Sequence, residues 1–485
     1  MTRFNDLVDL AYDTHLRDRA KIEELDSYAR GDQHEPYGAR GHSDEFRALA
    51  RRSVFNWISL AVNIPCQMSI IEGYRVRDDS DPAEWDAFVG NGMDRRQGAI
   101  HRASAVFGHS FAEVEMPNGA TYGGNPLPKI KALPTKRMVV LYDDPFNDRF
   151  PVFAMRIDAT PGADSPAEAT VWYGSERMRV SWRGARGERS VRIVSREDHG
   201  FPVVPIVRWV IDMDLEGRTT GLVAPLIEPQ DEVNQAKYDL VVTRNFSSYK
   251  VRTASGLEGE PLIDPVTGEQ VVDAHTGEPV FVAPEIGPEK FIVSEDEKTK
   301  FGTLDETPLD GFIASLNQSV EHFAAVSQIP PHALQGRMAN LSAEALVAAE
   351  EQLMRLVGSI QRSWGESWVT AFQLLAYAMG DEEAINDYSG QVRWRDMRAR
   401  SFGETADALG KMAQMLGVPP RSLWKQIPGL DAATLREWHD AADRLPPVET
   451  TQQGTAINMS RALAGMSATT ARNDGAAVPS RRRAA

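Results

Sequence analysis

The sequence predicts an α+β protein with several structural regions, and three observations point to this class. At 485 residues the chain is too long for one compact core. Short strand-forming runs gather between residues 73 and 210, whereas helical patterns dominate before and after them. Residues 342 to 380 lack proline and repeat apolar residues at steps of three and four, so we expect one helix of roughly 55 Å there.

Composition and charge narrow the functional classes. Hydrophobic residues make up 42% and charged residues 25% of the chain, as in a folded globular protein. The formal charge of −16, from 53 basic and 69 acidic residues, argues against a protein that grips nucleic acid tightly through its phosphates. The single cysteine, Cys66, excludes an internal disulfide and a multi-cysteine metal site, and its apolar neighbours favour a buried structural thiol. Without a long apolar run or a hydrophobic leader, we expect a cytoplasmic product that spans no membrane.

The first half of the chain combines helices with a sheet region. Helices are predicted over residues 4 to 26 and 43 to 67, because Gly31 and Pro36 interrupt the period between them. Five β-prone runs separated by turn residues then predict a mixed and mostly antiparallel sheet. These runs are residues 111–115, 138–142, 152–157, 169–173 and 203–207.

The second half alternates helices with a small β-rich insert. We expect helices over residues 228 to 247 and 309 to 327, on either side of short strands and turns between 249 and 307. The insert contains two near repeats, Asp-Pro-Val-Thr-Gly-Glu-Gln-Val-Val and Asp-Ala-His-Thr-Gly-Glu-Pro-Val-Phe, which a β-hairpin or a small duplicated unit would explain. After the long helix we expect a strand at 392–396, two or three helices between 401 and 444, and a flexible tail from 449.

A loop with strong start signals precedes the long helix. Ile329 and Pro330 open this loop, and Ser342 is a good N-cap, with Asn340 as an alternative. Glu344 falls in the positive field of the first helical turn. Taken alone, the pattern also fits an ordinary loop and cap before a core helix.

The segment from Ile329 to Leu346 resembles the corresponding segment of tailed-bacteriophage portal proteins, the rings that connect phage head to tail. The turn from Tyr28 to Gln33 and the spaced Asn56 resemble further features of that family. The order helix, β-rich insert, helix, loop and very long helix is also similar to the portal order. The resemblance extends over nearly the whole chain to about residue 444.

The resemblance implies a portal fold, with a mixed β-rich wing, a helical stem, a small β-rich clip, a very long tunnel-lining helix and a helical crown, assembled into a ring. The implied regions are 1–227 for the N-terminal helices and wing, 228–248 for the first stem helix, 249–307 for the clip, 308–328 for the second stem helix, 329–341 for the tunnel loop, 342–380 for the long helix, 381–400 for the return to the wing, 401–448 for the crown and 449–485 for the tail. The near repeats set this clip apart, so its contact residues cannot be carried over.

Two groups of residues are candidates for touching DNA. In the portal family the tunnel loop projects into the central channel, so the resemblance assigns a DNA-facing role to Gln335, Gly336, Arg337, Met338, Ala339, Asn340 and Leu341. Of these, Arg337 and Asn340 could reach phosphates, and Gly336 supplies backbone freedom. Lys237 and Arg244 lie on the same side of the helix from 228 to 247, where they could meet either DNA or the acidic groups of a neighbouring subunit.

The function that the resemblance implies is that of a portal. Such a protein forms a cyclic homo-oligomer, dodecameric in this family, at one capsid vertex, through which double-stranded DNA is packaged and ejected. The implied partners are the chain itself, the DNA, the terminase packaging motor, the head-completion or tail adaptor protein, and the major capsid and scaffolding proteins, with no membrane. The protein would belong to the virion, and to the host cytoplasm during assembly.

We expect no enzyme activity, metal or cofactor. The sequence has no G-x-x-x-x-G-K-[ST] loop, no H-E-x-x-H and no G-x-S-x-G. The histidines are scattered singly and show no metal-ligand spacing, as at His15, His34, His42, His101, His109 and His332. Two alternatives remain open: a metal-dependent hydrolase or nuclease built on the β-rich middle region, and a monomeric scaffold or adaptor without an axial hole.

Overall fold

The structure is a computed structural model of the chain. It describes residues 2–38, 44–76, 79–80, 82–117, 127–162, 165–184, 189–247, 252–255, 260–264, 267–273, 277–278, 280–282, 300–303, 308–335, 343–395, 402–424, 427 and 432–444. Contacts within the chain define two compact units, Met1–Asp396 and Met397–Ala485.

Three helices open the first unit: α1 (Thr2–Arg30), α2 (Asp44–Ser53) and α3 (Ile58–Met68). The helix predicted over 4–26 is present and extends further at both ends. The single helix predicted over 43–67 is wrong, because residues 54–57 separate α2 from α3. There the backbone N–H groups of Phe55 and Trp57 donate to side-chain amides of α6 (Ile227–Ser247) instead of continuing a helix.

Two antiparallel sheets form the β-rich middle of the unit. One has the strand order β5-β6-β7-β8-β9 and the other β10-β3-β4. The bounds are β3 His109–Glu115, β4 Lys129–Leu133, β5 Met138–Leu141, β6 Phe153–Ala159, β7 Ala167–Tyr173, β8 Glu176–Arg183, β9 Ser190–Asp198 and β10 Ile206–Val210. All strand pairs in the described residues are antiparallel, which agrees with the predicted sheet region. The sequence pattern predicts neither β4, β8 and β9, which carry many charged side chains, nor the helices at residues 83–90 and 93–107, which lie in the range predicted to hold only strands.

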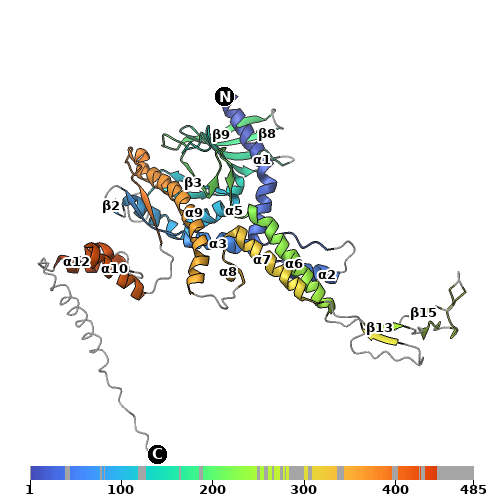
Figure 1. Cartoon of the computed structure of the whole chain (residues 1–485). Helices are drawn as coiled ribbons and strands as arrows, with labels where there is room; N and C mark the ends of the chain where they lie inside the picture. Colours follow the sequence, from blue (N-terminus) through green and yellow to red (C-terminus); the bar gives the residue numbers. More distant parts are fainter. Residues whose placement is uncertain are drawn as a thin grey trace, which may run out of the picture. The chain divides into compact units, whose positions relative to one another are not determined.

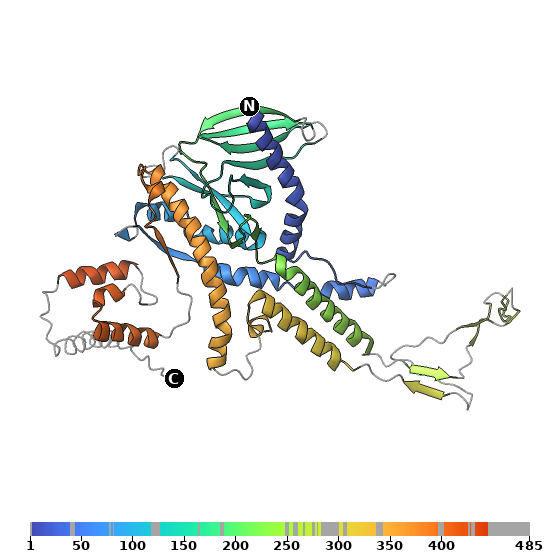
Figure 2. The ribbon, with the colours of Figure 1, turned by 45° about the horizontal axis from the view of Figure 1, so that its top comes forward.

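Helix α1 lies across one face of the five-stranded sheet (Figures 1 and 2). Its residues Val8 and Tyr12 share a buried cluster with Met155 and other apolar side chains of the sheet. The Arg189 guanidinium lies 4.8 Å from the Tyr12 ring centre and donates to Asp13 Oδ1 at 2.7 Å. Arg189 directly precedes β9, so this contact fixes α1 to the start of that strand.

The central core is organised by α5 (Met93–Phe107) and α9 (Ala343–Ala378), which crosses the unit in Figure 2. The predicted stripe of α9 is buried from Val357 to Leu375. Trp364 stacks on His101 at 4.3 Å between ring centres, and Trp368 Nε1 donates to His101 Nε2 at 2.8 Å. Burial lowers the pKa of His101 to about 3, so the neutral ring can accept that bond.

Smaller elements complete the unit. Helix α4 (Ala83–Gly90) packs against α9, and β17 (Gln391–Trp394) pairs with β1 (Ile71–Val76), which also pairs with β2 (Asp79–Ser80). The strand predicted at 392–396 therefore returns to the first unit. The remaining short elements are β11 Asp212–Met213, β12 Thr219–Thr220 and the 3₁₀ helices η1 Thr135–Arg137, η2 Ala224–Leu226 and η3 Ala384–Asn386.

Helices α6 and α7 (Asp310–Ser327) lie side by side; α6 leads away from the body and α7 leads back to it (Figures 1 and 2). We refer to them as the stem helices. Both lie close to the ranges predicted from the sequence. Beyond them, β13 (Arg252–Ser255) pairs with β16 (Lys300–Thr303), and β14 (Glu260–Pro261) pairs with β15 (Phe281–Val282).

The near repeats of the insert form two turns with the same hydrogen bonds. In the first turn, the N–H groups of Asp264 and Gly268 donate to the carbonyls of Glu269 and Asp264, both at 2.9 Å. The second turn repeats both bonds nine residues later, each at 2.8 Å. The repeated bonds agree with a small duplicated unit, and an antiparallel bridge between Ile263 and Gln270 closes the first turn as in a β-hairpin.

The second unit is helical where it is described, with α10 (Phe402–Leu416), α11 (Pro420–Leu423) and α12 (Ala432–Asp443). These helices fall within the range predicted for two or three helices. Among the helices described in either unit, none combines the length and hydrophobicity that crossing a lipid bilayer requires.

Candidate functional site

The stem helices join the body at a root, which we define as residues 227–238 of α6 and the side chains that contact them. The end of α1, the turn after it, residues 54–57 and α7 all reach this root. Because α6 has polar residues on most sides, hydrogen bonds contribute much of the contact.

Two buried amides form the centre of the stem root. Gln230 is fully buried and Asn234 is 1% exposed. Gln230 Oε1 accepts from the backbone N–H groups of Trp57 at 3.0 Å and Ile58 at 3.3 Å, and Asn234 Oδ1 accepts from that of Phe55 at 2.9 Å. A helix leaves its first N–H groups without internal partners, so these amides satisfy the start of α3 from a distant helix. We call Gln230 and Asn234 the amide clamp.

The turn after α1 fits against the same root. Tyr28 is 1% exposed, and its hydroxyl donates to Asp231 Oδ2 at 2.7 Å. Gly31 has φ of +84°, and a Cβ there would lie 2.9 Å from Asn56 Nδ2, so the turn requires glycine. Gln33 Nε2 donates to the backbone carbonyl of residue 55. The structure thus brings together the turn and the asparagine that carried part of the family resemblance.

The two stem helices are tied to each other at the root. Glu232 of α6 accepts from Ser319 Oγ at 3.0 Å through Oε1 and lies 3.1 Å from His322 Nδ1 through Oε2. The ring of Phe323 meets Trp57 edge-on, with 5.8 Å between ring centres. Helix α7 therefore contacts both α6 and residues 54–57.

The structure describes only part of the predicted tunnel loop. Of the loop predicted over 329–341, residues 331–335 form helix α8 (Pro331–Gln335) instead of a loop. Among the DNA-facing candidates, Gln335 is exposed at the end of α8, whereas residues 336–341 lie outside the described residues. The loop is anchored on its first side by Ile329 and Leu334, which are 2% and 8% exposed. On its other side α9 begins at Ala343. The structure therefore fixes the flanks of the loop and leaves its DNA-facing role a prediction.

The two predicted stem cations occupy different environments. Lys237 Nζ lies 5.4 Å from the ring centre of Phe55, so this side chain belongs to the stem root. Arg244 is exposed two turns further along α6. The structure does not bring the two cations together, and Arg244 is the better placed of them for contact outside the subunit.

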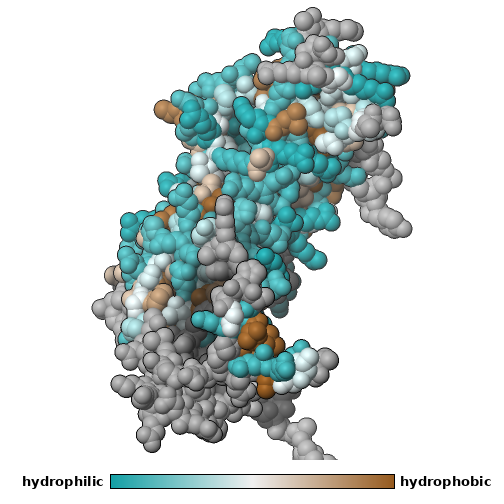
Figure 3. Space-filling model, turned by 90° about the vertical axis from the view of Figure 1, so that its right-hand side faces the viewer, coloured by the Kyte–Doolittle hydropathy of each residue, from teal (hydrophilic) through white to brown (hydrophobic). Residues whose placement is uncertain are grey.

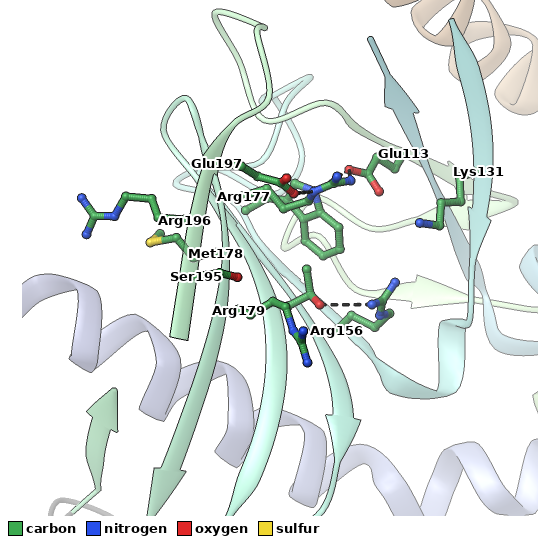
Figure 4. A pocket seen from close by; sticks show the side chains of 11 residues that line it. Glu113, Lys131, Arg156, Arg177, Met178, Arg179, Ser195, Arg196 and Glu197 are labelled. Carbon is green, nitrogen blue, oxygen red and sulfur yellow. Dashed lines mark hydrogen bonds and ion pairs between the residues drawn. The ribbon is translucent and has the colours of Figure 1, made fainter. Parts of the chain in front are cut away.

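The carboxylates of the β-rich middle gather around an arginine. A pocket of about 280 Å³ is lined by residues of both sheets, and Arg177 of β8 reaches into it (Figure 4). Its Nη1 donates to Glu113 at 2.9 Å and Glu115 at 2.6 Å, and its Nε bonds Glu197. Trp172 Nε1 also donates to Glu113, at 2.7 Å. Burial raises the pKa of Glu113, so the guanidinium and the indole are needed to hold its charge.

This arrangement does not favour the hydrolase or nuclease alternative. In the described ranges, no group of three or more His, Cys, Asp or Glu side chains is placed to hold a metal ion. Asp144 Oδ1 instead accepts from the backbone N–H groups of Phe146 and Asn147 within a turn, at 3.1 Å each. Cys66 is buried, and burial raises the pKa of its thiol to about 12, as suits a structural thiol.

Comparison with known proteins identifies the family. The model of the family described as "Phage portal protein, SPP1 Gp6-like" matches residues 9–445. The chain belongs to this phage portal protein family, whose members are structural components of phage particles rather than enzymes.

Two curated relatives are portal proteins of mycobacterial phages. The chain is 25% identical to the portal protein of Mycobacterium phage D29 over 395 residues, covering 79% of this chain and 78% of the relative. It is 24% identical to the portal protein of Mycobacterium phage L5 over 373 residues, covering 75% and 73%. A solved chain from the neck of an empty GTA particle is 13% identical, with a TM-score of 0.38, 88% of this chain covered and 99% of that one.

Sequence reasoning missed the amide clamp. Gln230 and Asn234 are four residues apart and therefore share one face of α6. The signal that could have found them is a pair of amides on the side of a helix that also carries Val233 and Tyr238, both buried. Side-chain amides on a buried helix face require hydrogen-bond partners. A non-helical segment such as residues 54–57 can supply them through its backbone N–H groups.

Proposed function

We propose that this chain forms a closed ring of identical subunits, twelve by family resemblance, through which double-stranded DNA enters and leaves a capsid at one vertex. Membership of the portal family supports the general role. The observation that carries the ring proposal is the pair of stem helices, which project from the body and are held there by the buried root. Head-to-tail contacts between such subunits close into a ring with an axial hole when the rotation between them closes.

Apolar surface along α7 supports contacts with neighbouring subunits. Ile313 and Val326 of α7 are 44% and 38% exposed, and Phe312 and Leu316 are only partly covered. Figure 3 shows a largely hydrophilic face with small hydrophobic patches on the side toward which the stem projects. In a ring, an adjacent stem would cover such apolar residues and stabilise the assembly.

The charge of the long helices suits a channel for DNA. Helix α6 carries four acidic and two basic residues, α7 two acidic and no basic ones, and α9 four acidic and two basic ones. Each phosphate that a protein neutralises releases counterions and deepens the energy well that the DNA must escape. An acidic wall holds phosphates weakly, so it lets the duplex slide.

The contacts with DNA and partners complete the proposal. The tunnel loop, residues 335–341, faces the axis, and Arg244 touches either DNA or the adjacent stem. The insert at residues 249–307 forms the clip, to which the packaging motor and later the tail adaptor dock. The β-rich middle forms the wing and α10 to α12 the crown, toward the capsid interior and its scaffolding.

Deletion of residues 335–341 tests the channel role. We expect the variant to assemble into rings of normal size, because the flanking Ile329 and Leu334 stay buried, while capsids built with it contain no DNA. A control variant replaces the same residues with glycine and serine at unchanged length, which separates loop length from loop chemistry. If the deletion prevents ring assembly, as judged by electron microscopy, the loop is structural and its DNA-facing role is wrong.

A further inference from the structure

A groove of about 730 Å³ runs along the outer side of α9 in the first unit. Its walls are α9 itself, the connection from β5 to β6, strand β10 and strand β17. The groove lies apart from the stem root, and neither the family match nor the relatives assign it a role. Three arginines line it: Arg149, Arg208 and Arg362.

None of these arginines has a carboxylate partner within ion-pair distance in the part of the chain that the structure describes. Arg149 donates to Thr370 Oγ1 at 3.1 Å and to the Ile385 carbonyl at 2.9 Å, and it lies over the rings of Phe150 and Tyr388 at 5.1 and 5.8 Å. All of these partners are uncharged. Burial lowers the pKa of Arg149, which is the effect expected of a cation without a counterion.

Among the residues that the structure describes, Arg208 and Arg362 likewise have no counterion. The Arg208 guanidinium lies 4.2 Å from the centre of the Tyr142 ring and donates to the Pro145 carbonyl at 2.7 Å. Tyr142 Oη, in the same wall, is buried and has no hydrogen-bond partner. The Arg362 side chain is exposed, and its Nε bonds only the carbonyl of Gly358 in its own helix, at 3.4 Å.

The two acidic residues that line the groove, Asp148 and Glu366, do not neutralise the positive charge of the three arginines. Asp148 Oδ2 accepts from the backbone N–H of Asp144 at 2.7 Å, and Glu366 is exposed on α9. Neither forms an ion pair with the three arginines. Elsewhere in the first unit, by contrast, Arg177 and Arg189 each hold two or more carboxylates. In a chain with an excess of 16 negative charges, three arginines gathered in one groove without bound acids make that groove complementary to an acidic partner.

We propose that this groove receives an acidic segment of a second copy of this chain, whose carboxylates pair with Arg149, Arg208 and Arg362. This inference rests on the proposed ring and names one face of its subunit contact. A guanidinium presents paired N–H donors in the fork that a carboxylate fits, and those of Arg149 and Arg208 lie over aromatic rings. The remaining walls include Val369 and Trp394, which suit packed protein side chains better than a phosphate backbone.

The geometry also fits a head-to-tail contact. The groove is basic where the rest of the molecule is acidic, so it is not complementary to itself. Such a patch pairs with a different surface on the neighbour, and a repeated contact of that kind generates a ring. Each subunit then offers its groove to one neighbour and its acidic segment to the other.

The charge reversal Arg362→Glu tests the proposal. Arg362 is exposed and bonded only within its helix, so we expect the variant to fold, as checked by circular dichroism. Like charges placed across an interface are costly, so the concentration needed for ring assembly should rise by about tenfold or more. The matched control is Arg355→Glu, an exposed arginine two turns away on α9 and outside the groove, which should assemble like the unmodified chain.

A cross-linking experiment identifies the occupant. Cys66 is buried, so a photoreactive maleimide can be directed to the groove through Glu366→Cys in the full chain. Irradiation of purified rings without DNA should give covalent dimers. Cross-links that appear only after duplex DNA is added, or none at all in assembled rings, would overturn the proposal.

The two proposals fail separately. If the Arg362→Glu chain forms rings at the same concentration as the unmodified chain, the groove is not a subunit contact, although the ring itself stands. If the unmodified chain forms no rings under any condition, the proposed function fails and the groove loses its basis with it.

Discussion

Replacement of Gln230 by methionine would test the stem root directly. Methionine has similar length and helix propensity, so α6 itself should persist. The side chain would still fill its buried position, but it would no longer accept from the N–H groups of Trp57 and Ile58, now at 3.0 and 3.3 Å from Oε1. The bond from Gln230 Nε2 to Asn234 Oδ1, at 3.1 Å, would be lost as well.

The expected loss follows from the number of groups left without partners. A buried polar group without a partner costs about 1–3 kcal/mol, so two N–H groups predict a loss of about 2–6 kcal/mol in local stability. Since about 1.4 kcal/mol corresponds to a factor of ten, protection of residues 54–59 against hydrogen exchange should fall at least about 30-fold.

The assay is hydrogen exchange with peptide-level mass spectrometry, and Gln235→Met provides the control. Gln235 lies on the same helix and bonds the backbone of Tyr37 at 2.8 and 3.3 Å in a solvent-exposed position. Its replacement should cost no more than about 1 kcal/mol, because water can replace the lost partner. Equal protection of residues 54–59 in the Gln230→Met and unmodified chains would refute the amide clamp.

Two further substitutions and one pH series test other contacts of the first unit. Gly31→Ala should lower the free energy of unfolding by about 1–3 kcal/mol in denaturant titrations, because the alanine methyl meets Asn56 at a φ of +84°. Stability should fall by about 1.4 kcal/mol per pH unit as pH drops below 6.5, because His101, with a folded pKa of about 3, binds its proton only when unfolded; a flat profile would contradict this. Arg177→Met should cost about 2–3 kcal/mol at neutral pH by stranding Glu113, whose pKa burial raises, and less as the pH falls and Glu113 protonates; a loss independent of pH would count against the pairing.

Local patterns in the sequence predicted the long helix α9 and the stem helices α6 and α7 well, but they missed α4 and α5, which fall in the range predicted to hold only strands. The stripe of α9 repeats over many turns, so its period identifies both the helix and the buried face that contains Trp364 and Trp368. The repeats around Gly268 and Gly277 predict turns, since glycine readily adopts positive φ. Both glycines do so in the structure. In each case the decisive signal lies within a few residues.

Features that depend on distant partners were not predictable. The break between α2 and α3 is made by Gln230, more than 170 residues away, so the local helical period gives no warning of it. Strand β8 carries alternating arginines such as Arg177, whose partners lie on β3 and β9. The same limit applies to the candidate site: Lys237 stays a candidate for contact with DNA or a neighbouring subunit, but its contact with the distant ring of Phe55 could not be read from the sequence.

Cryo-electron microscopy of the purified 53.7 kDa chain tests the central claim most directly. We expect closed rings of many identical copies, with α9 and the stem helices arranged around an axial hole wide enough for a DNA duplex. A particle of one copy, or an assembly whose stem helices are buried without a central opening, would contradict it.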